Sequence, residues 1–227
     1  MYDSKDRSYF ENIRKPLLDF IPLQNRNGTT LEIGAGSGDN LIYAKENGYA
    51  KVIYGIELVE VNGSLQNSNE FEQFDIGNIE QMELNFENGL FDTIIMGDIL
   101  EHLVDPYLIV KKMKKYLTPN GVFVASIPNI RNLKTFRNIF IRGSFKYDDA
   151  GIFDRTHLRF FTKKNMIELF ENNDCKVQRI KSSLEFKSGS VAFKNKITFG
   201  IFEEFLASQY YILAKNNPTQ STSLNGT

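Results

Sequence analysis

Three glycines at alternate positions and a carboxylate form the clearest chemical pattern in this sequence. An apolar run leads into Gly34, Gly36 and Gly38, and a second apolar run, over residues 52–56, ends at Glu57. In parallel α/β sheets, a glycine-rich turn after the first strand brings bare backbone against a nucleoside, and an acid after the second strand binds ribose hydroxyls. The pattern therefore predicts a site for a nucleoside-containing cofactor.

The spacing of the glycines indicates which cofactor. A dinucleotide fingerprint, G-x-G-x-x-G, requires its third glycine at position 39, which is Asp39 in this sequence. Glu32, two residues before the first glycine, would also place a second negative charge beside a pyrophosphate. A carboxylate suits a cofactor with an ammonium group, and S-adenosylmethionine has that group together with a sulfonium and an adenosine.

The composition favours one larger α/β domain and excludes several classes of protein. The chain has 227 residues, a formal net charge of −1 and a single cysteine, Cys175. No apolar run approaches the ~20 residues of a membrane helix, and the charged first 20 residues lack the apolar core of a signal peptide. We therefore expect a cytoplasmic protein with no disulfide, metal cofactor, nucleic-acid partner or stable membrane anchor.

Strand and helix patterns alternate along the chain, which predicts a doubly wound α/β sheet. The expected strands cover residues 29–33, 52–56, 71–75, 91–96, 122–127, 177–180 and 209–214. The expected helices cover residues 8–20, 39–47 and 162–172, and a further helix opens at Asp105-Pro106 and closes in a turn over residues 118–121. Such sheets bind ligands at the carboxyl ends of their strands.

The segment after the fifth strand is too long for a plain crossover. Residues 131–146 hold five basic side chains and no acid, and Leu133, Phe136 and Phe140 fall on one helical face. We interpret residues 130–153 as a basic helical lid that attracts a phosphorylated acceptor, with contact to a membrane surface as the alternative. The expected organisation is an N-terminal helical cap (1–28), the main domain with its lid (29–215) and a disordered tail (216–227).

Four motifs, in this order, resemble those of class I S-adenosylmethionine-dependent methyltransferases over roughly residues 8–215. They are the glycine turn, Glu57, Asp75 and the run Phe-Asp-Thr-Ile-Ile-Met-Gly-Asp-Ile-Leu-Glu-His over residues 91–102. Ile127-Pro128-Asn129 and residues 153–162 are similar to bacterial methyltransferases associated with sugar and surface-polysaccharide biosynthesis. The resemblance implies a seven-stranded, mostly parallel sheet with an antiparallel last strand and helices on both faces.

The resemblance also implies which residues hold the cofactor. The glycine turn and Glu32 would bind the methionine half, Glu57 the ribose hydroxyls, and Asp75 the adenine amino group. Two residues of the first helix would cap the cofactor. The complete expected set is Tyr9, Arg14, Glu32, Gly34, Ala35, Gly36, Glu57, Leu58, Asp75, Ile76, Asp98 and Ile99.

Three further residues are candidates for the chemistry. His102 and His157 are the only histidines, and an unperturbed pKa of about 6.5 suits a general base at neutral pH. His157 and Arg159 lie in a polar island between apolar residues and would bind an acceptor through a carboxylate or phosphate. The open alternative is structural: a histidine that bonds a loop carbonyl, and a charge network with Asp154 and Arg155.

The implied function is methyl transfer (EC 2.1.1.-) from S-adenosylmethionine, with S-adenosylhomocysteine as product. The expected acceptor is an oxygen of a sugar, a nucleotide-linked sugar or a polysaccharide precursor. Nitrogen or carbon methylation of another small metabolite is one alternative, and an inactive methyltransferase-fold partner protein is another. An NAD-dependent sugar-modifying enzyme is disfavoured by Asp39. A monomer or a homodimer is expected.

Overall fold

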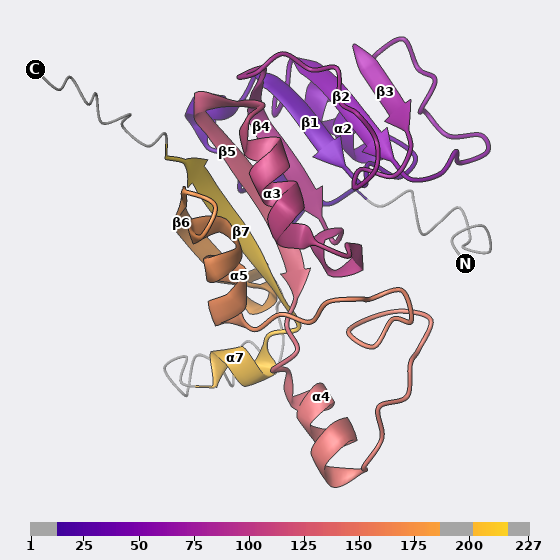
Figure 1. Cartoon of the computed structure of the whole chain (residues 1–227), viewed down its shortest axis with the longest axis vertical. Helices are drawn as coiled ribbons and strands as arrows, with labels where there is room; N and C mark the ends of the chain where they lie inside the picture. Colours follow the sequence, from indigo (N-terminus) through magenta and orange to yellow (C-terminus); the bar gives the residue numbers. More distant parts are fainter. Residues whose placement is uncertain (1–12, 187–201, 218–227) are drawn as a thin grey trace, which may run out of the picture.

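A computed structural model describes residues 13–186 and 202–217 and confirms the α/β prediction (Figure 1). Its strands are β1 (Thr29–Ile33), β2 (Val52–Glu57), β3 (Gln73–Ile76), β4 (Phe91–Gly97), β5 (Leu117–Pro128), β6 (Cys175–Ser182) and β7 (Gln209–Asn216). They form one seven-stranded sheet in the order β3-β2-β1-β4-β5-β7-β6. Strands β1 to β5 are mutually parallel, and β7 is antiparallel to both of its neighbours.

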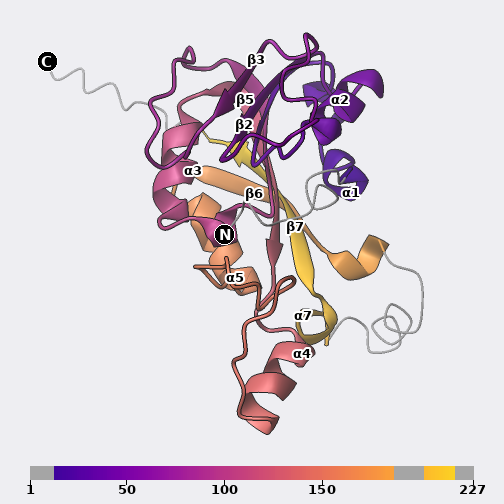
Figure 2. The same cartoon turned by 90° about the vertical axis from the view of Figure 1, so that its right-hand side faces the viewer.

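Helices cover both faces of the sheet, and a separate apolar core lies between the sheet and the helices on each face. Helices α1 (Lys15–Leu18) and α2 (Asp39–Glu46) lie on one face, and α3 (Pro106–Lys114) and α5 (Lys163–Glu171) lie on the other (Figure 2). The amino end of α3 is capped by the Asp105 carboxylate, which accepts a hydrogen bond from the Leu108 amide at 2.9 Å. Among the described helices, none is long and apolar enough to cross a membrane.

The strand order reverses between β1 and β4, and this reversal positions the site. Ile33 at the end of β1 pairs with Ile56 of β2 on one side and with Met96 of β4 on the other. The connections that leave β1 and β4 run to opposite faces of the sheet, which opens a crevice between their carboxyl ends. The glycine turn and Asp98 therefore emerge side by side.

The predicted turn over residues 118–121 is wrong as a strand boundary. Strand β5 already begins at Leu117, which pairs with Phe91. The register then shifts, so that Thr93 pairs with Val122. Residues 118–121 form an irregularity inside β5, because the chain enters the sheet directly from α3.

The N-terminal helix is shorter in the described residues than its apolar spacing predicts. Helix α1 covers only Lys15–Leu18, with Pro16 in its first turn, and a 3₁₀ turn follows at Leu23–Asn25. Proline supports the start of a helix but cannot donate to a preceding turn. Residues 1–12, which include Tyr9, and residues 218–227, which hold most of the predicted tail, lie outside the described residues.

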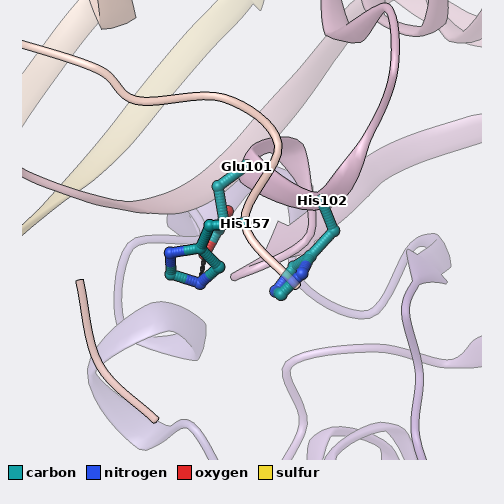
Figure 3. Close-up of side chains that lie close together, drawn as sticks. All are labelled: Glu101, His102 and His157. Atoms are coloured by element: carbon teal, nitrogen blue, oxygen red, sulfur yellow. Dashed lines mark ion pairs between the residues drawn. The ribbon is translucent and has the colours of Figure 1, made fainter. Parts of the chain in front are cut away.

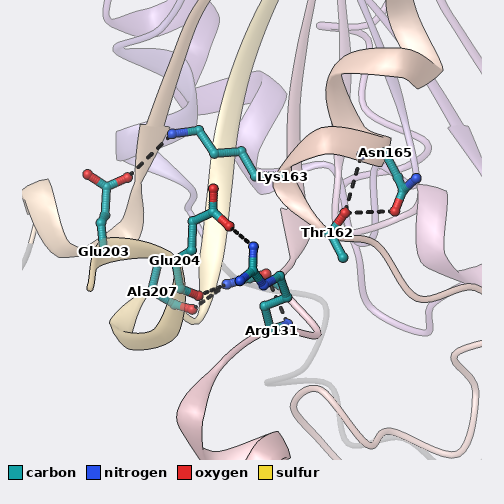
Figure 4. Close-up of polar contacts among 8 residues, drawn as sticks. Arg131, Thr162, Lys163, Asn165, Glu203, Glu204 and Ala207 are labelled. Carbon is teal, nitrogen blue, oxygen red and sulfur yellow. Dashed lines mark hydrogen bonds and ion pairs between the residues drawn. The ribbon is translucent and has the colours of Figure 1, made fainter. Parts of the chain in front are cut away.

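The insertion after β5 projects from the sheet instead of covering it (Figure 1). Helix α4 (Leu133–Phe136) continues into a π-helix over Arg137–Ile141. Its base is tied to α7 (Glu203–Leu206), where Arg131 pairs with Glu204 (Figure 4). Asn129 Nδ2 also donates to the carbonyls of Glu204 and Ala207 at 2.7 and 3.0 Å. The helical part of the predicted lid is thus an outward arm.

Candidate active site

The glycine turn joins β1 to α2 in left-handed backbone. Gly34 and Gly36 have φ values of 75° and 57°, and Gly38, which precedes α2, has a φ of 91°. Residues with a Cβ rarely adopt these angles. A Cβ at Gly34 would also lie 3.3 Å from the Ile99 side chain. The glycines are therefore required by the conformation of the turn and by the close approach of the segment that follows β4.

A cavity opens at the carboxyl ends of β1, β2 and β4, as the topology predicts; we call it the cofactor cavity. Of the predicted site residues, those that line it are Arg14, Gly34, Ala35, Gly36, Glu57, Leu58, Asp98, Ile99 and His102. Asn40 and the segment 77–80 also line it and were not predicted. The segment 77–80 could have been predicted from its position directly after the third strand, because ligands bind at the carboxyl ends of the strands.

Asp75 and Ile76 do not line this cavity. The Asp75 carboxylate accepts a hydrogen bond from Gln73 Nε2 at 2.7 Å, and the Ile76 side chain is exposed. Strand β3 extends one residue beyond the predicted end, and the segment 77–80 that follows it lines the cavity in place of Asp75 and Ile76. The adenine contacts expected of these two residues stay a prediction.

Glu57 is buried at the end of β2 and is held by two backbone amides. Its Oε2 accepts from the Gly36 N–H and its Oε1 accepts from the Leu58 N–H, each at 2.7 Å. Burial raises the pKa of this carboxyl, and the backbone amides of Gly36, Leu58 and Val59 oppose the rise. These bonds fix the carboxylate beside the glycine turn, so that its orientation is set before any ligand binds.

Glu32 lies beneath the turn instead of lining the cavity. Its side chain is fully buried, and its Oε1 accepts from Asn40 Nδ2 at 2.9 Å and lies 3.8 Å from Arg14 Nη1. Burial raises the pKa of Glu32 to about 7, although Arg14 and Asn40 oppose the rise. Arg14 and Asn40, which contact Glu32, do line the cavity, so the contact predicted between Glu32 and the methionine ammonium stays a prediction.

Replacing Glu32 by glutamine is expected to change the pH dependence of stability. In the unfolded chain this carboxyl has a pKa near 4.5 and is ionised above that pH. The folded protein must then either take up a proton at Glu32 or bury its negative charge, and either costs free energy of folding. The resulting penalty grows from pH 4.5 to about 7 and is complete above 7, where it reaches about 3 kcal/mol. Denaturant unfolding should show Glu32→Gln more stable than wild type by that order at pH 8 and equal to it near pH 4.5; a difference that does not vary with pH would contradict this.

Asp98 follows β4 in a strained conformation at the mouth of the cavity. Its φ is 54°, a left-handed value that costs a non-glycine residue about 1–3 kcal/mol. The carboxylate accepts from Ser126 Oγ at 3.0 Å and from Gln209 Nε2, and Arg14 Nε lies 3.5 Å away. Gln209 is the first residue of the antiparallel strand β7, and no pattern in the sequence identified it as a site residue.

The two histidines lie together (Figure 3), and backbone carbonyls fix both rings. Their ring centroids are 4.7 Å apart with planes at 76°. His102 Nδ1 lies 3.1 Å from the Thr156 carbonyl, and His157 Nδ1 lies 3.1 Å from the Ile152 carbonyl. Because a carbonyl can only accept, each contact assigns the proton to Nδ1 and leaves a lone pair on Nε2. Burial, and next the neighbouring His157, lower the pKa of His102 to about 4, so its ring is neutral at pH 7.

A second cavity adjoins the first; we call it the acceptor cavity. Both are lined by Arg14, Asp98 and His102, and the second is also lined by His157, Gln209 and the loop residues 150–152. Neither of these two cavities is lined by residues 131–146. The part of the predicted lid that faces the site is thus the returning loop. In sequence, nothing distinguished this loop from the basic helix before it.

Arg159 does not join the histidine cluster. Its Nε donates to the Val104 carbonyl at 3.0 Å, and its Nη2 donates to the same oxygen. The side chain lines a separate groove with Tyr107 and Phe160. Asp154 is also engaged locally, since its Oδ1 accepts from the Thr156 amide and hydroxyl at 2.9 and 2.6 Å. The structural alternative for Arg159 and Asp154 therefore fits their contacts.

Comparisons with known proteins show the family and the fold of this chain. The family model described as a methyltransferase domain matches residues 5–180. A methyltransferase of Archaeoglobus fulgidus, described as S-adenosylmethionine-dependent, has a TM-score of 0.61 at 18% identity, over 93% of this chain and 95% of that one. No curated protein sequence matches the chain significantly.

Two further solved structures share the fold at low identity. The 1,6-didemethyltoxoflavin-N1-methyltransferase of Burkholderia thailandensis, solved with its substrate and S-adenosylhomocysteine, has a TM-score of 0.61 at 15% identity, over 95% of this chain and 83% of that one. A chain of the complex between the Haloferax volcanii Trm112 methyltransferase activator and a methyltransferase has a TM-score of 0.63 at 13% identity, over 93% and 92%.

Proposed function

This chain belongs to the methyltransferase domain family, and on that premise we propose that it transfers the methyl group of S-adenosylmethionine to an oxygen of a small-molecule acceptor. The observation that carries the proposal is the pair of adjoining cavities that share Arg14, Asp98 and His102. One cavity has the glycine turn and Glu57 for a nucleoside, and the other has room for an acceptor against a neutral histidine.

The proposed roles on the cofactor side follow from the contacts. The glycine turn gives backbone access to the methionine half, and Arg14 and Asp98 meet at the boundary of the two cavities, 3.5 Å apart. Glu57 already accepts two amide hydrogen bonds, and each carboxylate oxygen has a further lone pair for a ribose hydroxyl. Glu32, buried behind the turn, holds Asn40 through a hydrogen bond and lies 3.8 Å from Arg14, and both of these residues line the cofactor cavity.

Methyl transfer from a sulfonium is an in-line displacement, in which the acceptor atom attacks the methyl carbon and the sulfur keeps the electron pair. The cofactor is already activated, so the protein contributes proximity, alignment and exclusion of water. A hydroxyl is a weak nucleophile and gains from loss of its proton. His102, neutral and present in both cavities, is placed to assist that loss.

A sugar, nucleotide-linked sugar or polysaccharide precursor is the acceptor that we propose first. Arg137 and Arg142 are exposed on the arm that follows β5; they line neither cavity, but their positive charge suits a phosphorylated acceptor. Nitrogen methylation is the second candidate, because the Burkholderia protein of the same fold is an N1-methyltransferase. Transfer of labelled methyl groups to nucleotide sugars and to amines, measured side by side, separates the two.

S-adenosylmethionine is expected to raise the melting temperature of the protein, and NAD is not. A ligand at 100 times its Kd stabilises the folded state by about 2.7 kcal/mol, which corresponds to roughly 5–10 °C for a domain of this size. S-adenosylhomocysteine should give a similar shift, since it keeps the groups that the glycine turn and Glu57 bind. Equal shifts with NAD, or no shift with either adenosyl compound, would exclude the proposed cofactor.

A further inference from the structure

Three side chains in the acceptor cavity form a cluster that methyl transfer by itself does not explain. Glu101 and His102 are adjacent in a 3₁₀ turn over Leu100–His102, and His157 comes from the loop that returns from the arm. One ligand atom from each residue lies within 4.8 Å of the other two, and His157 Nε2 is 3.9 Å from Glu101 Oε1 (Figure 3). We call these residues the Glu-His-His cluster.

Glu101 is the member of the cluster that most requires an explanation. Its side chain is 1% exposed, and among the described residues neither carboxyl oxygen has a hydrogen-bond partner. A buried carboxyl without partners is costly, and a bound cation would satisfy both of its oxygens.

The two histidines have the secondary contacts that are typical of metal ligands. A histidine that binds a metal through one ring nitrogen almost always donates the other N–H to a carbonyl, a carboxylate or water. Here both Nδ1 atoms face backbone carbonyls, those of Thr156 and Ile152. The tautomer that these carbonyls select presents Nε2, the stronger candidate for a ligand atom, on each ring. Neutral imidazole is also the form that binds metals.

We propose that Glu101, His102 and His157 bind a divalent cation, and, resting on the proposed function, that this cation binds the acceptor hydroxyl beside the methyl donor. Two imidazoles and one carboxylate suit Zn²⁺ or Mn²⁺ and leave further positions open. Tetrahedral zinc holds its ligand atoms about 3.3 Å apart, so the side chains would draw together by about an ångström. This proposal replaces the expectation, drawn from the single cysteine, of a protein without metal.

The position of the cluster gives the cation its chemical role. His102 lines both cavities, so an oxygen bound to the cation would face the cofactor cavity. Coordination lowers the pKa of a hydroxyl. The hydroxyl proton leaves to solvent, the oxygen forms the new bond to the methyl carbon, and the electron pair of the broken carbon–sulfur bond stays on sulfur. Charge balances, since the sulfonium becomes a neutral thioether.

The test measures cation binding directly, without cofactor or acceptor. Tag-free protein treated with chelator is titrated with Zn²⁺ and with Mn²⁺ by calorimetry, and Co²⁺ absorption reports the ligand set. The chain has only two histidines, so imidazole ligation of a bound ion identifies this cluster. We expect one ion per chain and a loss of affinity greater than about 100-fold in Glu101→Gln and in His157→Asn, since even outer contacts of a metal site contribute 10- to 100-fold.

Glu168→Gln is the control, because it makes the same change at a partly buried acid of α5 outside the cluster. Its affinity should equal that of wild type. Thermal unfolding shows whether each variant is folded, and His157→Asn carries the test if Glu101→Gln is not. No ion bound by wild type, or binding that survives in both cluster variants, overturns the proposal. A missing thermal shift with S-adenosylmethionine would instead overturn the proposed function, because the cation titration does not depend on the cofactor.

Discussion

Replacing Glu57 by alanine is expected to weaken S-adenosylmethionine binding by about 100- to 10,000-fold. In the proposed complex this carboxylate accepts from both ribose hydroxyls, and a hydrogen bond to a charged group contributes about 1.5–3 kcal/mol. The two backbone amides that hold the carboxylate, those of Gly36 and Leu58, would also lose their acceptor. The glycine turn would then lose a contact that shapes it before the ligand arrives. Calorimetric titration with S-adenosylmethionine measures the change.

Glu60→Ala is the matched control for this experiment. Glu60 is an exposed acid in the loop that follows β2, and it lines neither of the two cavities. Its replacement tests for a general effect of removing negative charge from this loop. Thermal unfolding separates lost affinity from lost fold, since unsatisfied amides at Gly36 and Leu58 cost about 1–3 kcal/mol of stability. An affinity for the cofactor that stays within a few-fold of wild type in Glu57→Ala would remove this residue from the proposed site.

Replacing His102 by glutamine is expected to lower kcat by about 100- to 10,000-fold, the usual contribution of assisted proton transfer. Glutamine keeps polarity and similar volume but offers no basic nitrogen. The affinity for S-adenosylhomocysteine should stay near that of wild type, because the turn and Glu57 remain in place. His157→Gln should have a smaller effect if His102 acts alone, since His157 lines only the acceptor cavity. Single-turnover rates with saturating cofactor measure the chemical step for each variant.

The pattern of effects separates a histidine base from a cation. If His102 itself accepts the proton, chelator leaves wild-type activity unchanged and Glu101→Gln stays active. If the Glu-His-His cluster holds a cation, chelator removes activity and all three cluster variants fall together. Values of kcat near wild type in both histidine variants would show that neither mechanism operates, and that proximity alone drives transfer or another group is the base.

The cofactor half of the site could be predicted because its signals are local in the sequence. Gly34, Gly36 and Glu57 take their positions from the ends of two short strands, and both strands are predicted within one residue. The acceptor half could not be predicted in the same way. Glu101 is adjacent in sequence to His102, which was predicted as a site residue. Its burial, which makes it a candidate metal ligand, results from the loop around residues 158–159 that packs against it.

The case of Arg159 shows the physical reason. The amides of Leu158 and Arg159 both donate to the Glu101 carbonyl, at 2.8 and 2.9 Å. This pairing holds the returning loop against the 3₁₀ turn, with His157 on the cavity side and the Arg159 side chain bonded to Val104. His157 and Arg159, which are two residues apart in the sequence, therefore line different cavities.

By itself, the sequence determined the alternation of strands and helices, the seven-stranded sheet and the glycine turn with its acid, because the periodicity of apolar residues and the backbone freedom of glycine act over a few neighbouring residues. Only the tertiary structure decided which side chains meet across the crevice. It placed Gln209 on Asp98, buried Glu32 under Arg14 and Asn40, and joined Glu101 and His102 to His157. These contacts depend on sheet order and on the path of one long insertion, which no local pattern specifies.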